Sequence, residues 1–228
     1  MASKALIFGR ENSPSNYKLG FGGEGSAADW TTPRHRHTKE QFRYVLSGEY
    51  QITDKEVLPE GWVAYFPEGA WYGPQVKSAS LYMLTLQFGG PTGLGHFGPK
   101  TLEAAIQRLK TRGKFEDGVY TWIDKDGKKH NQDAAEAVWE QGLGRKVTYA
   151  EPRYQQVMMI NPASFDWIKD KNQSGVARKN LGDFTERHSR VGFIRIDKGC
   201  KLRFGGAPAP EVVFVNEGAV THENTRHD

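Results

Sequence analysis

Residues 33–48 of the chain read PRHRHTKEQFRYVLSG, and this stretch is the clearest guide to how the N-terminal part folds. From Gln41 onward it is rich in aromatic and aliphatic residues and ends at a Ser-Gly pair, a pattern typical of a β-strand that runs into a turn. Alternate side chains of a strand share a face. We therefore expect His35, His37 and Gln41 to point one way and Glu40 to point the other.

The stretch is flanked by further short segments with strand character. Residues 17–21, 61–66 and 81–88 are aromatic and aliphatic, and Gly-rich or Pro-containing turns follow each of them. Short strands with this spacing and punctuation predict an antiparallel barrel or sandwich.

The middle of the chain, residues 91–150, has a different pattern. Residues 101–110 (TLEAAIQRLK) place apolar residues on one helical face, and residues 133–141 predict a second short helix. Between them, Asp126-Gly127 is a favourable turn for a β-hairpin. We expect an α-rich insert between two β-regions, with strands returning at 155–160 and 191–196.

An internal repeat links the two β-regions. KLGFGG at residues 18–23 is echoed by KLRFGG at 201–206, and each copy precedes a strand-like segment that ends in Gly, at 41–48 and at 211–218. The echo predicts two related barrels. The second lacks a His-x-His segment, so residues 199–218 should form strands without a metal site.

Two imidazoles at i and i+2 on one strand face suit a transition metal, and the amide oxygen of Gln41 can add a third ligand. The alternative is a pair of surface histidines beside Arg34 and Arg36.

The stretch 33–48 resembles the first cupin motif, a His-x-His followed by a carboxylate position and then a Gly, here Gly48. Gly61, Pro67 and Gly69 resemble the glycines and proline of the second motif. The resemblance implies an all-β fold, a cupin double-stranded β-helix or jelly-roll barrel with a metal near its mouth. We expect this cupin barrel over residues 1–90, a small α-helical insert over 91–150 and a partial second barrel over 151–228.

The chain departs from the cupin pattern at two positions. The family's glutamate falls on Gln41, and its last histidine falls on Tyr72. Loss of the carboxylate removes a charge that helps to hold a divalent ion, and a tyrosine is a poor ligand unless it is ionised, with a reference pKa of about 10. Two hypotheses follow. The site binds a divalent transition metal (Fe, Mn, Ni, Cu or Zn) through His35, His37 and Gln41, or it binds no metal.

The resemblance implies a small-molecule enzyme, and we expect a metal-dependent oxygenase acting on a carbonyl-bearing or phenolic substrate. Tyr72 is the candidate proton donor, and Arg43, on the histidine side of the strand, is the candidate clamp for a carboxylate or enolate. The alternatives are an isomerase or lyase on the same scaffold, and a barrel that binds a small ligand without catalysis.

Composition narrows the partners and the compartment. The net charge of +4 comes from 31 basic and 27 acidic residues spread along the chain, which argues against a nucleic-acid partner. No apolar run is long enough for a membrane span, and the single Cys200 fits a reducing compartment. We expect a cytoplasmic protein that forms a homo-oligomer.

Overall fold

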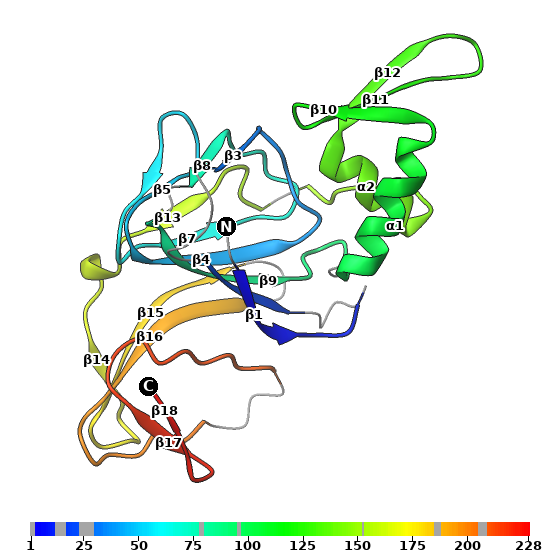
Figure 1. The fold of residues 1–228 in the computed structure, drawn as a ribbon. Helices are drawn as coiled ribbons and strands as arrows, with labels where there is room; N and C mark the ends of the chain where they lie inside the picture. Colours follow the sequence, from blue (N-terminus) through cyan, green and yellow to red (C-terminus); the bar gives the residue numbers. More distant parts are fainter. Residues whose placement is uncertain are drawn as a thin grey trace.

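The computed structural model describes residues 3–11, 17–22, 30–77, 80–94, 97–151, 153–184, 188–204 and 209–228. Strands dominate, and the described residues contain two α-helices and one short 3-10 turn, so the expected all-β class with a small helical insert is confirmed. Figure 1 shows a barrel of strands with the insert beside it and a separate group of strands beneath it.

The N-terminal barrel is built from two antiparallel sheets. The six-stranded sheet has the order β1-β2-β9-β4-β7-β13, and the four-stranded sheet has the order β3-β8-β5-β6. The strands of the first sheet are β1 (Ser3–Phe8), β2 (Lys18–Gly22), β9 (Tyr82–Phe88), β4 (Glu40–Ser47), β7 (Val63–Phe66) and β13 (Met158–Ile160). Those of the second are β3 (Trp30–Thr32), β8 (Gln75–Lys77), β5 (Tyr50–Gln51) and β6 (Val57–Leu58).

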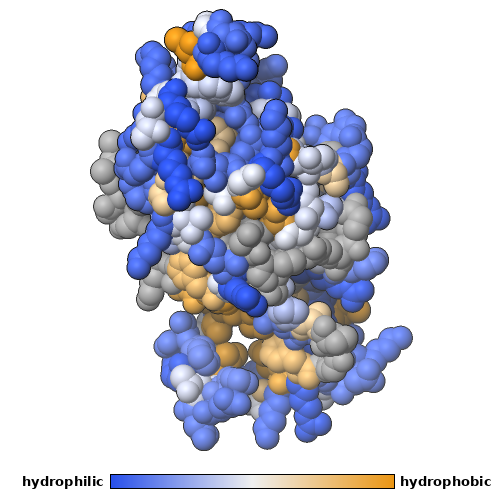
Figure 2. Space-filling model, turned by 90° about the vertical axis from the view of Figure 1, so that its right-hand side faces the viewer, coloured by the Kyte–Doolittle hydropathy of each residue, from blue (hydrophilic) through white to orange (hydrophobic). Residues whose placement is uncertain are grey.

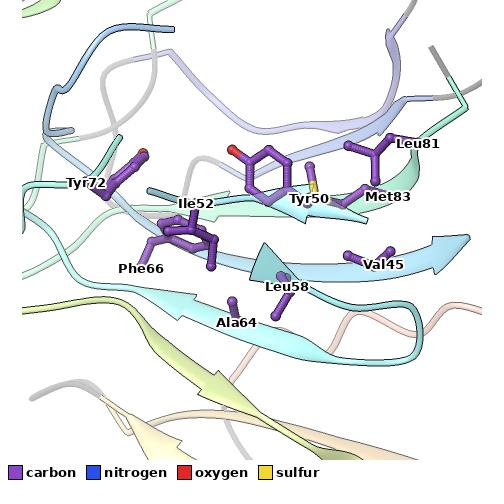
Figure 3. Close-up of a cluster of buried hydrophobic side chains, with 9 residues drawn as sticks. All are labelled: Val45, Tyr50, Ile52, Leu58, Ala64, Phe66, Tyr72, Leu81 and Met83. Carbon is purple, nitrogen blue, oxygen red and sulfur yellow. The ribbon is translucent and has the colours of Figure 1, made fainter. Parts of the chain in front are cut away.

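Strand β4 alternates as its sequence predicts. Val45 packs inside the barrel with Ala64 and Phe66 of β7, whereas Phe42 and Tyr65 belong to a second apolar cluster on the outer face of the same sheet. The inner cluster is drawn in Figure 3. Strands of this sheet therefore contribute to two cores, one on each face.

The insert contains the two expected helices. Helix α1 (Pro99–Lys110) has Pro at its first turn, and α2 (Ala134–Leu143) is capped by Asp133, whose side chain accepts a hydrogen bond from the Glu136 amide. The predicted hairpin is present, with Asp126-Gly127 in its turn between β11 (Val119–Ile123) and β12 (Lys129–Asp133). An additional strand, β10 (Gly113–Glu116), pairs with β11.

The C-terminal region differs from a second barrel. Strand β13 joins the first barrel by pairing with β7. After the 3-10 turn η1 (Pro162–Ser164), a three-stranded sheet β14-β15-β16 covers the outer face of the six-stranded sheet, and a hairpin β17-β18 ends the chain. These strands are β14 (Ile168–Lys169), β15 (Val176–Phe184), β16 (Ser189–Ile196), β17 (Val220–His222) and β18 (Thr225–His227).

The prediction of strands over residues 199–218 is wrong for the part of that segment that the structure describes. Residues 199–204 and 209–218 contain no strand, and residues 205–208 lie outside the described residues. Phe204, Val213 and Phe214 are exposed, and no described strand pairs with this segment.

The surface hydropathy differs between the part of the molecule that holds the insert and the part that holds the C-terminal strands. Figure 2 shows a mainly hydrophilic upper part, which holds the insert, and more hydrophobic residues around a hollow in the lower part, which holds the C-terminal strands. Within the described ranges, neither helix has the length and apolar character required to cross a bilayer.

Candidate functional site

Backbone hydrogen bonds join the two motif segments of the barrel. His35 and Tyr72 form an isolated antiparallel bridge, with N–H···O distances of 2.9 and 3.0 Å in the two directions. The amide of Gly69 donates to the carbonyl of His37 at 3.0 Å. Gly73 has a positive φ of 101°, and a Cβ there would lie 2.9 Å from the Pro33 carbonyl oxygen, so glycine is required for this close approach.

The bridge places three rings next to one another. The ring centroids of His35 and His37 are 4.8 Å apart, and the Tyr72 ring lies 4.7 Å from His35 and 5.8 Å from His37. His35 is buried, and its Nδ1 lies 2.7 Å from the carbonyl oxygen of Pro33. Because a carbonyl only accepts, Nδ1 carries the proton and the lone pair of a neutral His35 is on Nε2.

Gln41 lies deeper in the barrel and is fully buried. Its Oε1 accepts hydrogen bonds from Arg43 Nε at 3.2 Å, Arg43 Nη2 at 2.8 Å and Gln87 Nε2 at 3.2 Å. Its Nε2 donates to the Tyr72 hydroxyl at 3.0 Å. The amide oxygen that is a candidate metal ligand in the sequence therefore faces the guanidinium of Arg43.

Arg43 is a buried cation, with 5% of its surface exposed. Its Nη1 donates to the Tyr50 hydroxyl, and its guanidinium carbon lies 4.2 Å from the centroid of the Phe66 ring. None of the salt bridges within the described ranges involves Arg43. A buried charge is costly unless it is paired, so this guanidinium favours an anion in the barrel.

Burial keeps the two inner phenols neutral. It raises the pKa of Tyr72 and that of Tyr50 above the ordinary value, and the nearby positive charge of Arg43 offsets only part of that rise. Both hydroxyls are therefore hydrogen-bonding groups at neutral pH and not phenolate ligands. Figure 3 shows the oxygens of Tyr50 and Tyr72 turned toward the same space, whereas Val45, Leu58 and Leu81 lie further along the barrel.

The donor set does not fit a divalent metal with the usual three or four protein ligands. Two imidazoles are suitably placed, but Gln41 Oε1 is engaged by Arg43, and Tyr72 is neutral. Within the described residues, no group of three His, Cys, Asp or Glu side chains is arranged to hold a metal ion. The positive charge of Arg43 next to the third position further disfavours a cation there.

The insert contacts the outer side of the His-x-His segment. Arg36, between the two histidines in sequence, donates from Nε and Nη2 to Glu136 Oε2 at 3.0 and 2.7 Å and lies over the Tyr149 ring. Burial raises the pKa of Asp133, and the charge of a protonated His35 acts in the opposite direction. Acidic groups at the start of α2 thus lie close to the site.

All five residues predicted from the sequence come together in the barrel: His35, His37, Gln41, Arg43 and Tyr72. The sequence reasoning did not find Tyr50, Gln75 and Gln87. Gln87 lies directly opposite Gln41 in the pairing of β9 with β4, and no local signal gives the register of strands so far apart in sequence.

The part of the chain from residue 27 to residue 86 matches the family model of the cupin domain. The N-terminal barrel is a cupin domain. The matched residues include His35, His37 and Tyr72, and the cupin fold agrees with the two-sheet barrel described above.

Solved structures with low overall similarity also include cupin proteins. A provisionally assigned dioxygenase from Nostoc punctiforme is 11% identical over 85% of this chain and 50% of its own, with a TM-score of 0.49. A mutant of Bacillus subtilis oxalate decarboxylase is 13% identical over 78% of this chain and 47% of its own, with a TM-score of 0.33. A protein with a cupin-like fold from Ralstonia eutropha is 14% identical over 67% of this chain and 83% of its own, with a TM-score of 0.29.

The chain spans about half of the length of the Nostoc and Bacillus proteins. No curated protein sequence matches it significantly.

Proposed function

We propose that this cupin is a small-molecule enzyme that moves a proton on a carbonyl-bearing or phenolic substrate by general acid–base catalysis, as an isomerase or lyase. The observation that carries the proposal is the fixed tautomer of His35, which presents Nε2 as a base in a buried site next to the neutral hydroxyl of Tyr72. A base and a donor that act on the same substrate are the minimum set for enolisation.

In this mechanism, His35 Nε2 removes a proton from the carbon next to a substrate carbonyl. The electrons of the broken C–H bond form the C=C bond of an enolate, and the carbonyl oxygen takes the negative charge. Tyr72 donates a hydrogen bond to that oxygen, and the positive charge of Arg43 stabilises it. Return of the proton to another carbon gives an isomer, whereas loss of a leaving group from the enolate gives a lyase product.

The second candidate is the metal-dependent oxygenase predicted from the sequence. The observation that favours it is the adjacent pair of imidazoles, with His35 held by a backbone carbonyl in the way that metal-bound histidines usually are. We derive no step through a metal, because Gln41 and Tyr72 do not complete its ligand set.

Hydrogen–deuterium exchange separates the candidates. The full chain, purified with and without a chelator, is incubated in D2O with a panel of 2-oxo acids, 1,3-diketones and hydroxyaryl ketones, and exchange at carbon is followed by NMR. We expect exchange that persists after chelation and is lost in His35→Ala. Oxygen consumption that depends on a bound redox metal, without exchange in the chelated protein, would instead support the oxygenase. Binding without either reaction would support a non-catalytic barrel.

We also infer that the chain forms a homo-oligomer. The exposed apolar side chains of Phe204, Val213 and Phe214 in the C-terminal region support this proposal, because exposed apolar side chains are candidates for burial at a subunit interface. Light scattering coupled to size-exclusion chromatography tests it, and a monomer at micromolar concentration would contradict it.

A further inference from the structure

The inner part of the cupin barrel has an excess of hydrogen-bond donors. Gln75, the first residue of β8, is 1% exposed, and its amide nitrogen has no hydrogen-bond partner among the described residues. The hydroxyl of Thr32, directly opposite Gln75 in the β3–β8 pairing and so on the same face, is also buried and lacks a partner there.

These groups belong to the same region as Arg43. In the pairing of β5 with β8, Tyr50 lies opposite Lys77, so Gln75, two residues along β8, is on the same face as Tyr50, whose hydroxyl accepts a hydrogen bond from Arg43. An arginine has five N–H donors. The contacts to Gln41 and Tyr50 described above use three of them, and Tyr72 is close enough to take a fourth, which leaves at least one for a ligand.

Most of the oxygens in this region are occupied, and an exception is Gln87 Oε1, which is buried and has no hydrogen-bond partner among the described residues. Gln41 Oε1 already accepts three hydrogen bonds, and the hydroxyls of Tyr72 and Tyr50 accept from Gln41 and Arg43 respectively. The region thus offers a buried positive charge that forms no salt bridge among the described residues, together with the Gln75 amide, which keeps at least one N–H for a ligand even where the other donates to the Tyr50 hydroxyl. Its missing partner is an acceptor with negative charge.

We propose that Arg43 and Gln75 form a subsite for the carboxylate of an organic acid, with the hydroxyl of Thr32 beside Gln75. A carboxylate has two oxygens with about four acceptor positions, which matches guanidinium, amide and hydroxyl donors around one point. The subsite names the substrate class of the proposed enzyme, an organic acid whose carbonyl lies toward His35. The link from this subsite to a reaction rests on the proposed function. The binding of a carboxylate does not, because a ligand can bind without turnover.

The test uses the full chain and two pairs of probes of similar size and shape, in which a carboxylate is replaced by its neutral amide: benzoate with benzamide, and pyruvate with pyruvamide. Binding is measured by calorimetry and ligand-observed NMR at constant ionic strength. We expect each carboxylate to bind at least about 10-fold more tightly than its neutral amide, as a charged hydrogen-bonded contact implies. Equal affinity within either pair would overturn the subsite.

Gln75→Glu gives a sharper test than removal of Arg43, which endangers folding. The new carboxylate lies next to Arg43 and takes the place of the ligand, so carboxylate binding should fall at least about 10-fold. The thermal midpoint should stay the same or rise. Gln155→Glu, at an exposed position, is the matched control and should leave binding unchanged. Unchanged benzoate affinity in Gln75→Glu would exclude the subsite.

The results also separate the two proposals. Carboxylate binding that depends on Gln75, without exchange of any substrate proton, would support the proposed subsite and contradict the proposed acid–base function. Proton exchange on neutral ketones, without tighter binding of carboxylates than of their amides, would support the proposed function and contradict the proposed subsite.

Discussion

The two faces of the six-stranded sheet are both buried but chemically opposite. On the inner face β4 carries Gln41 and Arg43, held in a polar network with Tyr72 and Tyr50. On the outer face the same strand carries Phe42, which packs with Tyr65, Phe88 and Phe184. Burial of apolar surface stabilises a fold, whereas burial of a charge costs free energy unless a partner compensates it. The outer face is therefore apolar along β4, whereas the inner face combines the apolar cluster around Val45 with the polar network that supports the proposed ligand subsite.

The largest effect should come from the outer face. Phe184→Ala removes a buried ring that contacts Phe42 and Tyr65, and we expect it to lower the free energy of unfolding by about 3–5 kcal/mol. Phe204→Ala is the control, because Phe204 is 49% exposed and its loss should cost about 0.5 kcal/mol or less. Urea denaturation measures both. Similar losses in the two variants would mean that the C-terminal sheet does not complete the outer core.

Tyr72→Phe tests the inner face. It removes the hydroxyl that accepts from Gln41 Nε2, and we expect turnover to fall by about 100-fold, which corresponds to about 2.7 kcal/mol. The unpaired amide should lower the free energy of unfolding by about 1–3 kcal/mol. Steady-state kinetics and urea denaturation give the two numbers. Tyr82→Phe, at an exposed tyrosine of β9, should change neither, and full activity in Tyr72→Phe would remove Tyr72 from the site.

The inner tyrosines should make the stability sensitive to alkaline pH. Burial raises the folded-state pKa of Tyr50 and Tyr72 above the unfolded value of about 10, so above that pH the unfolded chain loses protons that the folded chain keeps. Stability from each group is fully present below a pH of about 10 and falls by about 1.4 kcal/mol per pH unit above it. Urea denaturation from about pH 8 to about pH 11 should show this slope, and Tyr50→Phe should reduce it. An equal slope in wild type and variant would contradict the assignment.

The smallest effect is expected at the junction with the insert. Arg36 and Glu136 form an ion pair with side chains 26% and 14% exposed, and Glu136→Gln should cost about 1 kcal/mol or less. Glu116→Gln, in the exposed pair with Lys114, is the control and should have no measurable effect. If the loss at Glu136 approached that of Phe184→Ala, the insert would have to be counted as part of the barrel core.

Much of the N-terminal barrel was predictable from local patterns. The period of two in β4 placed Gln41 and Arg43 opposite Phe42, and apolar spacing with a preceding proline predicted α1. Glycine and proline between short strands indicated the turns. These signals are local, because they depend on the backbone preferences of a few neighbouring residues.

The repeated KLxFGG sequence shows that a local pattern is not sufficient to predict a strand. Residues 18–22 of its first copy form strand β2, paired with β1 and β9, whereas residues 201–204 of the second copy form no strand. A strand is stabilised by hydrogen bonds and side-chain contacts to its neighbours, so the same residues need not form one where neighbours are missing. The pairing of β13 with β7 is equally non-local and was not predicted.

The amino-acid sequence alone specifies which side chains are available to the site. Two histidines share one strand face, and Arg43 is on the same face. Gln41 and Tyr72 stand where the family pattern has a glutamate and a histidine. The hydrogen bonds and charge contacts among these side chains are decided by the tertiary structure. The register of β9 and the bridge between His35 and Tyr72 set Gln41 Oε1 against Arg43, and the Gln75 amide nitrogen is left without a partner among the described residues. The strength of these interactions depends on the distances between groups on strands that are far apart in sequence. Those distances are set only when the strands pair in the folded chain.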